Sequence, residues 1–303
     1  MESLLARLPS RSWIAVIRLR SLGDCVLTTP ALALLKSYRP DLRIRMVVEP
    51  RFAGVFEDHP EVEEISTKVG RRTDLVLNLH GGTRSMWMTL TSGAKFRAGF
   101  AHHRYSWIYS HRIPRAQQIL GEERPVHTAE HLASAMFWLG VPQAEIPRAS
   151  LYTGRRPSYL PYVVIHPFAS AAAKAWPQER FVSVATKLQS AGLEPMILAG
   201  PADDATPFAK FQVFRNAPLA EVKNLMSGAA LFIGNDSGPA HIAAAFGVPV
   251  VVLFGPSDPV TWAPWRTEAR VLTSRGGIGE IAVEQVIAAA EVLRPATVKE
   301  QQA

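Results

Sequence analysis

Short apolar runs of strand length alternate with helical patterns along most of this chain, and the alternation starts afresh in the second half. This alternation is typical of parallel sheets joined by crossover helices. Two series in a chain of 303 residues predict an α/β protein with two Rossmann-like domains of ordinary size, 1–152 and 153–303. We expect the join within 147–161, a polar stretch broken by Pro147, Gly154, Pro157 and Pro161.

The expected elements follow from these patterns. In the first series we expect strands at Trp13–Arg18, Ile44–Val48 and near Asp74–Leu79, a loop at Leu19–Asp24, and helices at Thr29–Tyr38 and His127–Leu139. In the second we expect strands at Tyr162–His166, Glu194–Ala199, Ala230–Gly234 and Val250–Phe254, and helices at Gln178–Ser190, Leu219–Ser227, Pro239–Phe246 and Ile281–Leu293. A polar tail from Pro295 is expected to be disordered.

The composition excludes several classes of protein. A hydrophobic fraction of 48% and a charged fraction of 19% are those of a soluble globular chain rather than a disordered or collagenous one. No run approaches the length that spans a bilayer, and Glu2 and Arg7 interrupt the start of the chain, so we expect neither insertion nor secretion. The single cysteine, Cys25, cannot form an internal disulfide, which agrees with a cytoplasmic location.

Positive charge is concentrated in the first half of the chain. The net charge is +7, and residues 1–150 hold 20 basic against 14 acidic side chains, whereas 151–303 hold 13 against 12. Between Ile65 and Arg115 only Asp74 opposes nine basic residues, Lys68, Arg71, Arg72, Arg84, Lys95, Arg97, Arg104, Arg112 and Arg115. Such a stretch suits an anionic partner, which charge alone leaves open among nucleic acid, a phosphorylated substrate and an anionic membrane. A solvated basic face that merely aids solubility is the alternative.

The first loop, Arg18 to Asp24, joins a buried strand to a helix and is therefore expected at the carboxyl edge of the sheet, where open α/β sheets bind ligands. Gly23 permits a tight turn, and Asp24 either caps the helix or accepts a proton from a substrate hydroxyl. A single glycine excludes both a dinucleotide-binding loop and a Walker loop.

Two loops of the second half have the chemistry of a phosphate site. The first, His166 to Pro177, contains Ser170 and Lys174, which can hold a phosphate by hydrogen bonding and by charge. The second, Gly234 to His241, ends a strand and opens a helix, whose N-terminus suits a diphosphate. Alternatively, Lys174 is an exposed loop residue, Ser237 caps the helix and His241 has a structural role.

Taken in order, these loops resemble the bacterial glycosyltransferases of family nine, typified by ADP-heptose:lipopolysaccharide heptosyltransferases. The resemblance covers about residues 13 to 295. Its main motifs are Arg18-x-x-Ser21-Leu22-Gly23-Asp24-x-x-x-Thr28-x-Pro30, Lys174-x-Trp176-Pro177, Gly234-x-Asp236-Ser237-Gly238-Pro239-x-His241 and Phe246-Gly247-Val248-Pro249. Weaker agreement lies at Asp74–Leu79 and at the Arg97-x-Gly99-Phe100 turn.

The resemblance implies a GT-B fold, two Rossmann-like domains facing a central cleft, and an inverting transfer from an ADP-sugar to an inner-core acceptor of lipopolysaccharide. Asp24 matches the family's base and Lys174 the lysine that neutralises the leaving diphosphate. Ser170, Asp236, Ser237, Gly238 and His241 match donor-binding positions. Because the lysine and the helix N-terminus supply positive charge, we expect no obligatory metal and no cofactor beyond the ADP-sugar donor.

The acceptor is then expected in the basic N-terminal domain. A lipid-linked anionic glycan at the inner-membrane leaflet would contact Arg18, Arg20, Ser21 and Gly23, together with Arg71, Arg72 and Arg97; Arg104 and Arg112 belong to the same hypothesis of acceptor or membrane contact. We expect a monomer that is peripherally bound to the membrane and does not bind nucleic acid.

Two other functions stay open. One is a GT-B transferase or epimerase that uses a different nucleotide-sugar. The other is a non-catalytic protein that binds a nucleotide-sugar or nucleic acid, for which Tyr105, Trp107 and Tyr109 within the basic stretch would supply stacking surfaces.

Overall fold

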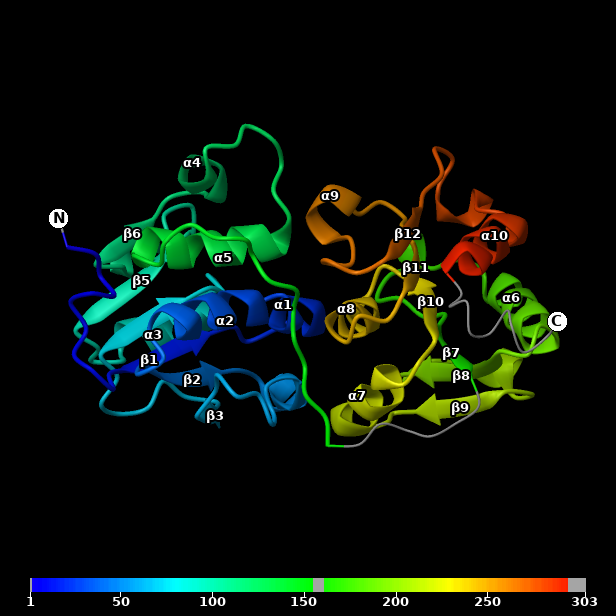
Figure 1. Cartoon of the computed structure of the whole chain (residues 1–303), viewed down its shortest axis with the longest axis horizontal. Helices are drawn as coiled ribbons and strands as arrows, with labels where there is room; N and C mark the ends of the chain where they lie inside the picture. Colours follow the sequence, from blue (N-terminus) through cyan, green and yellow to red (C-terminus); the bar gives the residue numbers. More distant parts are fainter. Residues whose placement is uncertain (1, 155–160, 294–303) are drawn as a thin grey trace. The chain divides into compact units, whose positions relative to one another are not determined.

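The computed structural model describes residues 2–154 and 161–293, which form two compact units, Met1–Tyr152 and Thr153–Ala303 (Figure 1). Each unit contains a six-stranded sheet in which every paired strand runs parallel to its neighbours. The predicted class, α/β with two parallel sheets, is confirmed. The tail from Pro295 and part of the expected join, 155–160, lie outside the described residues.

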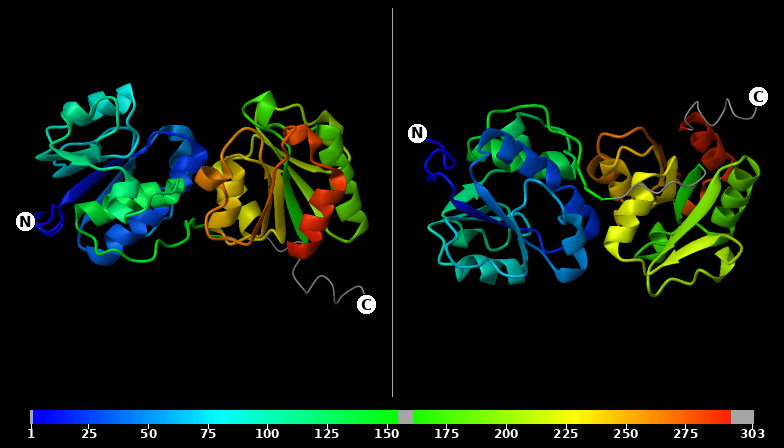
Figure 2. Two further views of the ribbon diagram at one scale, coloured as in Figure 1. Left: turned by 90° about the horizontal axis from the view of Figure 1, so that it is seen from above. Right: turned by 60° about the horizontal axis from the view of Figure 1, so that its bottom comes forward.

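The sheet of the first unit has the order β3-β2-β1-β4-β5-β6. Its strands are β1 (Trp13–Ile17), β2 (Arg43–Val47), β3 (Glu64–Ser66), β4 (Leu75–Asn78), β5 (Phe96–Phe100) and β6 (His111–Ile113). Its helices are α1 (Leu22–Val26), α2 (Thr29–Tyr38), α3 (Thr83–Leu90), α4 (Ala116–Leu120) and α5 (Thr128–Leu139), with 3-10 turns η1 (Pro50–Val55) and η2 (Ser106–Ile108). Helices α2 and α5 cover one face and α3 the other (Figures 1 and 2).

The sheet of the second unit has the order β12-β11-β10-β7-β8-β9. Its strands are β7 (Tyr162–His166), β8 (Glu194–Ala199), β9 (Gln212–Arg215), β10 (Leu231–Asn235), β11 (Val250–Leu253) and β12 (Ala269–Leu272). Its helices are α6 (Gln178–Ser190), α7 (Leu219–Ser227), α8 (Gly238–Ala245), α9 (Pro259–Trp262) and α10 (Val283–Leu293), with turns η3 (Ala172–Lys174), η4 (Thr206–Phe208) and η5 (Ile278–Glu280).

Both sheets change their winding direction between two central strands, and this is what positions the candidate site. In the first unit the order reverses between β1 and β4, and in the second between β10 and β7. Ligands of open α/β sheets bind at the carboxyl ends of the strands on either side of such a reversal. The loops after β1 and β4 in the first unit, and those after β7 and β10 in the second, therefore lie where such a ligand would bind.

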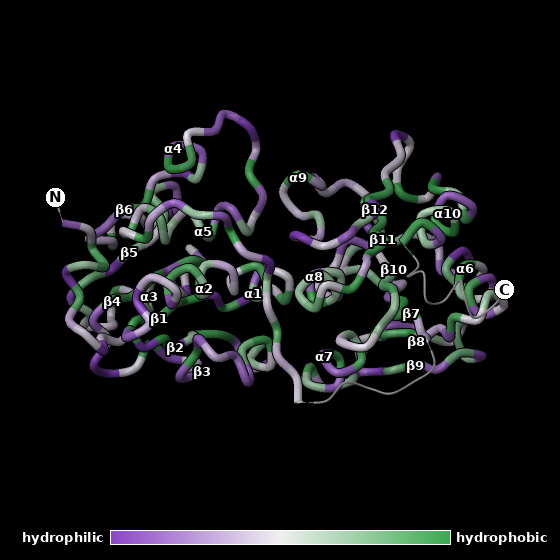
Figure 3. Tube along the Cα trace, in the orientation of Figure 1, coloured by the Kyte–Doolittle hydropathy of each residue, from purple (hydrophilic) through white to green (hydrophobic). Residues whose placement is uncertain are grey.

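The interior of each unit is apolar and tightly packed. Hydrophobic residues are concentrated in the strands and the inner helix faces, and hydrophilic ones in the connecting loops (Figure 3). In the second unit Trp176 is fully buried, meets Phe181 edge to face at 4.8 Å and donates its indole N–H to the carbonyl of Ile281 at 2.9 Å. This contact fixes the end of the loop after β7 to the segment that precedes α10.

Several predicted boundaries need correction. Helix α1 begins at Leu22, inside the expected loop, because Ser21 caps it. The segment around Arg97 is not a turn but the strand β5. Strands β3, β6, β9 and β12 and helix α3 were not predicted, because the strands are short and partly exposed and the helix carries mixed polar and apolar residues.

Candidate functional site

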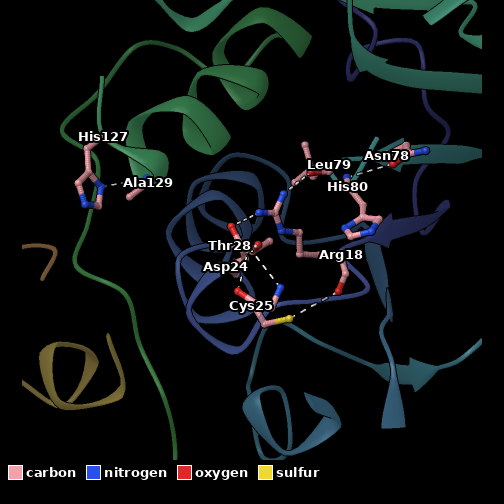
Figure 4. Close-up of polar contacts among 10 residues, drawn as sticks. Arg18, Asp24, Cys25, Thr28, Asn78, Leu79, His80, His127 and Ala129 are labelled. Atoms are coloured by element: carbon pink, nitrogen blue, oxygen red, sulfur yellow. Dashed lines mark hydrogen bonds and ion pairs between the residues drawn. The ribbon is translucent and has the colours of Figure 1, made fainter. Parts of the chain in front are cut away.

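The loop after β1 holds the carboxylate of Asp24 in a fixed position. Ser21 is the N-cap of α1 and Asp24 lies in its first turn. Oδ2 of Asp24 accepts hydrogen bonds from the backbone N–H of Ser21 at 3.2 Å and from its hydroxyl at 3.0 Å. The guanidinium of Arg18 donates to Oδ1 of Asp24 and to the carbonyl of Leu79, which follows β4 (Figure 4). Arg18 therefore ties the first loop to the next strand of the sheet.

This arrangement leaves Asp24 able to accept one more proton donor. A carboxylate offers about four acceptor positions, and three are taken by Arg18 and by the two groups of Ser21. The side chains of Arg18 and Asp24 are 12% and 16% exposed, so the pair is shielded but still reachable. A substrate hydroxyl is the kind of group that the remaining position accepts.

Cys25, next to Asp24, is not a nucleophile. Its side chain is fully buried and its Sγ lies 3.6 Å from the carbonyl oxygen of Arg18 (Figure 4). Burial raises the pKa of its thiol to about 12, and a protonated thiol is unreactive.

The end of β4 completes this edge of the first sheet. The amide oxygen of Asn78 accepts from the backbone N–H groups of His80 and Gly81, each at 3.0 Å, and its amide nitrogen donates to Thr89 of α3. The turn that carries His80 is thereby fixed beside Arg18 (Figure 4). Burial, reinforced by the positive charges of Arg18 and Arg20, lowers the pKa of His80, so its imidazole is neutral at pH 7. Sequence reasoning missed both Asn78 and His80 as site residues.

In the second unit, a lysine and an aspartate from different strands meet at the carboxyl edge. Lys174 ends η3 in the loop after β7, and its Nζ lies 3.0 Å from Oδ2 of Asp236, which follows β10. The Lys174 side chain is one-third exposed and the Asp236 side chain 9% exposed. The ammonium is therefore held in place but open to a ligand.

Two residues that carry no charge position this lysine. Asn235 accepts from the backbone N–H of Trp176 at 3.1 Å and donates to the carbonyl of Pro167 at 2.9 Å, so it binds both ends of the loop after β7. Gly255, after β11, lies against the loop so closely that a Cβ would stand 2.4 Å from the carbonyl oxygen of Ala173. Only glycine allows this approach.

Helix α8 presents its N-terminus at the same edge. Its N-cap is Ser237, whose hydroxyl donates to the carbonyl of Asn235 at 3.1 Å. The first backbone N–H groups of a helix have no partner within the helix, and the helix dipole adds positive potential there. Because α8 begins two residues after Asp236, the partner of Lys174, these N–H groups and the ammonium lie at the same edge of the sheet. An anion such as a diphosphate fits it.

The remaining predicted donor residues, Ser170 and His241, differ in their exposure to solvent. Ser170 is exposed in the loop after β7. His241 lies in the first turn of α8 and is only 4% exposed.

Three predicted acceptor residues lie away from Asp24, which corrects the expectation drawn from their charge. Asp74 exchanges hydrogen bonds with Trp13, the first residue of β1, so Arg71 and Arg72, just before it, lie at the amino edge of the sheet. Arg97 is the second residue of β5, and its guanidinium donates to the carbonyl oxygens of Ile108 and Ala94. Arg18, Arg20, Ser21 and Gly23 do share the edge with Asp24.

Within the described ranges, 2–154 and 161–293, no cluster of three or more His, Cys, Asp or Glu side chains has the arrangement of a metal site. Over the same ranges, no helix combines the length and the apolar character that crossing a bilayer requires.

Comparison with known proteins agrees with this fold. The family model of glycosyltransferase family 9 (heptosyltransferase) matches residues 64–280. Lipopolysaccharide heptosyltransferase 3 of Escherichia coli K12 is 27% identical, over 90% of this chain and 95% of that protein. The crystal structure of a family 9 glycosyl transferase from Veillonella parvula superposes with a TM-score of 0.83, at 24% identity over 96% of this chain and 98% of the other. The structure of E. coli ADP-heptose lipopolysaccharide heptosyltransferase II superposes with a TM-score of 0.78, at 20% identity over 96% of this chain and 99% of the other.

Proposed function

This chain belongs to glycosyltransferase family 9, and from that membership we propose that it transfers a heptose from ADP-heptose to the inner core of lipopolysaccharide. The observation that carries the proposal is the pairing of Lys174 with Asp236 beside the N-terminus of α8, a site for a leaving diphosphate. The relatives that cover most of the chain are named as lipopolysaccharide heptosyltransferases, and that supports the choice of sugar and acceptor.

We assign the acceptor to the first unit and the role of general base to Asp24. Its carboxylate would take the proton from an acceptor hydroxyl while that oxygen attacks the anomeric carbon of the donor, with inversion. Arg18 and Ser21 hold the carboxylate in the required orientation. Arg20, exposed on the same loop, and Gly23 are the remaining acceptor positions that we propose there.

We assign the donor to the second unit. As the bond between the anomeric carbon and the diphosphate oxygen breaks, the electron pair leaves with ADP and negative charge grows on the β-phosphate. Lys174 and the N–H groups of Ser237 and Gly238 would stabilise that charge in the transition state. Ser170, Asp236 and His241 complete the proposed donor set. We propose that no metal is required, because these groups supply the positive charge themselves.

The acceptor and its location account for the charge of the first unit. The inner core of lipopolysaccharide is an anionic glycan carried on a lipid, which suits the net positive charge of residues 1–150. We propose a cytoplasmic monomer that binds the inner membrane peripherally. Light scattering tests the oligomeric state, and sedimentation of the chain with membrane fractions tests its location.

A donor screen tests the proposed reaction. Stabilisation against heat reports ligand affinity, so ADP and ADP-heptose are expected to raise the melting temperature more than UDP, GDP or their sugars. Incubation with ADP-heptose and a deacylated, heptose-deficient core should then release ADP and add one heptose to the glycan. A clear preference for UDP or GDP would show that the donor carries a different nucleotide and would favour another GT-B transferase or an epimerase. Donor binding without any turnover would make the chain a nucleotide-sugar binding protein.

A further inference from the structure

Helix α3 of the first unit exposes large apolar side chains to solvent. Trp87 is 57% exposed and Leu90, three residues on, is 38% exposed. Residues three and four apart lie on one face of a helix, so these side chains form a single apolar strip. The opposite face of α3 is anchored to the sheet, because Ser85 and Thr89 are fully buried and Thr89 accepts from Asn78. The apolar strip of α3 is therefore directed away from the unit's core.

The turn η2 extends this apolar strip. Met86 of α3 packs with Ile108 and Tyr109, which follow the start of η2, and Thr83 bonds to the hydroxyl of Tyr105 at 3.1 Å. Trp107, which lies between Tyr105 and Ile108 in the sequence, is 63% exposed. Large exposed apolar side chains that cluster on a surface mark an interaction site more often than scattered ones do.

A basic groove borders the strip on its other side. The groove, about 360 Å³ in volume, is lined by Lys68, Arg71, Met88, Thr91 and Ser92, together with Val69 and Gly70. Thr91 is one turn beyond Trp87, so strip and groove are neighbours. Both cations are exposed, and none of the described residues that line the groove is acidic. The hydroxyl groups of Thr91 and Ser92 already donate to the carbonyl oxygens of Trp87 and Thr89. The groups of the groove that can bind a phosphate are therefore its two positive charges.

We propose that α3, η2 and this groove form the face by which the protein docks on an anionic lipid bilayer. Tryptophan prefers the boundary between headgroups and hydrocarbon, and lysine or arginine beside it is attracted by anionic lipids. Trp87, Leu90 and Trp107 enter that boundary, while Lys68 and Arg71 bind headgroup phosphates. The inference rests on the proposed function in one respect, that the acceptor is borne on a lipid.

The position of α3 suits that role. The helix begins three residues after His80, at the sheet edge that carries Asp24, and ends at the opposite edge. A bilayer under α3 would therefore lie alongside the loop to which we assign the acceptor. This also gives Arg71 a function, although it lies away from Asp24.

RNA fits the same surface less well. Stacking on bases requires exposed ring faces, yet Tyr109 is 5% exposed and the hydroxyl of Tyr105 is bonded to Thr83. The ring of Tyr105 is further covered by the guanidinium of Arg104, 5.4 Å from its centroid. Of these three aromatic residues only Trp107 offers an open face.

Vesicle flotation of the full chain tests the proposal. The wild type is expected to float with vesicles of phosphatidylcholine containing about one-third phosphatidylglycerol and much less with pure phosphatidylcholine, and high salt should weaken binding. Two double variants should each reduce partitioning onto the vesicles about tenfold or more: Trp87→Ser with Trp107→Ser, and Lys68→Glu with Arg71→Glu. The first loses the side chains that enter the headgroup boundary, and the second loses the attraction of two basic side chains to anionic lipids. Trp138→Ser on α5 and Arg275→Glu in the second unit are the matched controls and should bind as the wild type does.

Two outcomes overturn the proposal. Undiminished flotation of both double variants would show that another surface binds the vesicles. Binding of single-stranded RNA, lost in the same variants while the wild type fails to float, would establish RNA as the partner. Transfer to the deacylated, soluble acceptor should be unchanged in the tryptophan variant. If the wild type floats through this face but transfers no heptose, the proposed function fails and the docking face stands.

Discussion

Nζ of Lys174 lies 3.0 Å from Oδ2 of Asp236, although the two residues are 62 positions apart and follow different strands. The contact holds the ammonium beside the first turn of α8 without burying it. In the proposed reaction, a charge that is already in place when the diphosphate departs needs no reorganisation, which is the basis of electrostatic catalysis.

Replacing Lys174 by methionine should lower kcat by about a hundredfold or more, because one preorganised group is removed from the developing charge. Steady-state kinetics of ADP release measures this. The control is Lys187→Met, which removes an exposed lysine of α6 that pairs with Glu284 and should keep wild-type rates. Equal rates for both variants would contradict the role of Lys174.

Asp24→Asn keeps the shape of the side chain but removes the proposed base, so turnover should fall by about a hundredfold to ten-thousandfold. Stabilisation of the chain by ADP should persist, because the donor is assigned to the other unit. Asp41→Asn serves as the control, since Asp41 pairs with Arg39 on the surface of the same unit. Full turnover by the Asp24 variant would remove it from the mechanism.

Arg18→Gln should act through Asp24 and not through the donor. Glutamine cannot reach both the carboxylate and the carbonyl of Leu79, which Arg18 bonds together. We expect kcat to fall about tenfold or more with the KM for the donor unchanged, since misplacing a catalytic group is costly. Arg18→Lys keeps the charge and should recover part of the rate. A rise in donor KM at constant kcat would show a different role.

Gly255→Ala should disturb the loop of Lys174. The added Cβ would stand 2.4 Å from the carbonyl oxygen of Ala173, so the loop must move at a cost of about 1–3 kcal/mol in the free energy of unfolding. Denaturant unfolding measures that loss, and ADP-induced stabilisation should weaken with it. Gly279→Ala is the control, because a Cβ there meets nothing within 4 Å. Identical stabilities of the two variants would show that the loop yields freely.

Partly buried histidines should make the first unit sensitive to acid. Burial lowers the pKa of His103 to about 3 and that of His131 to about 4, whereas unfolded histidine titrates near 6.5. Below that pH the unfolded chain binds protons that the folded chain does not. The contribution of each histidine to the free energy of unfolding is therefore fully present above about pH 6.5. It is lost as the pH falls toward the pKa of the folded state, and the loss at pH 5 is at most about 2 kcal/mol per histidine.

Melting temperatures recorded from pH 7 to pH 5 test this. His131 stacks on Phe100 with 4.0 Å between ring centroids, so His131→Phe preserves the stacking and removes the titration. Its melting temperature should depend less steeply on pH than that of the wild type. The same slope in both proteins would rule out His131 as a source of acid sensitivity.

The sequence predicts the long and well-patterned elements closely. Helices α2, α6 and α7 and strands β7 and β8 begin and end at the expected residues, because each has either an amphipathic pattern or a continuous apolar run. Edge strands such as β9 and β12 bury none of their side chains fully, so the hydrophobic pattern that would predict them is absent.

The candidate site is predictable only in part. Motif resemblance pointed to Asp24 and Lys174, but neither the contact of Lys174 with Asp236 nor the bridging by Asn235 follows from sequence spacing, because tertiary packing creates both. Charge counting grouped Arg71 and Arg72 with the acceptor loop, yet net charge says nothing about which edge of a sheet a residue occupies.

The hydrogen bond from the indole of Trp176 to the carbonyl of Ile281 makes the donor loop depend on a residue translated much later. A nascent chain that stops before Ile281 contains Lys174 and Asp236 but lacks the acceptor that secures the end of their loop. The loop of Lys174 is therefore secured at its end only once the chain has been made as far as Ile281.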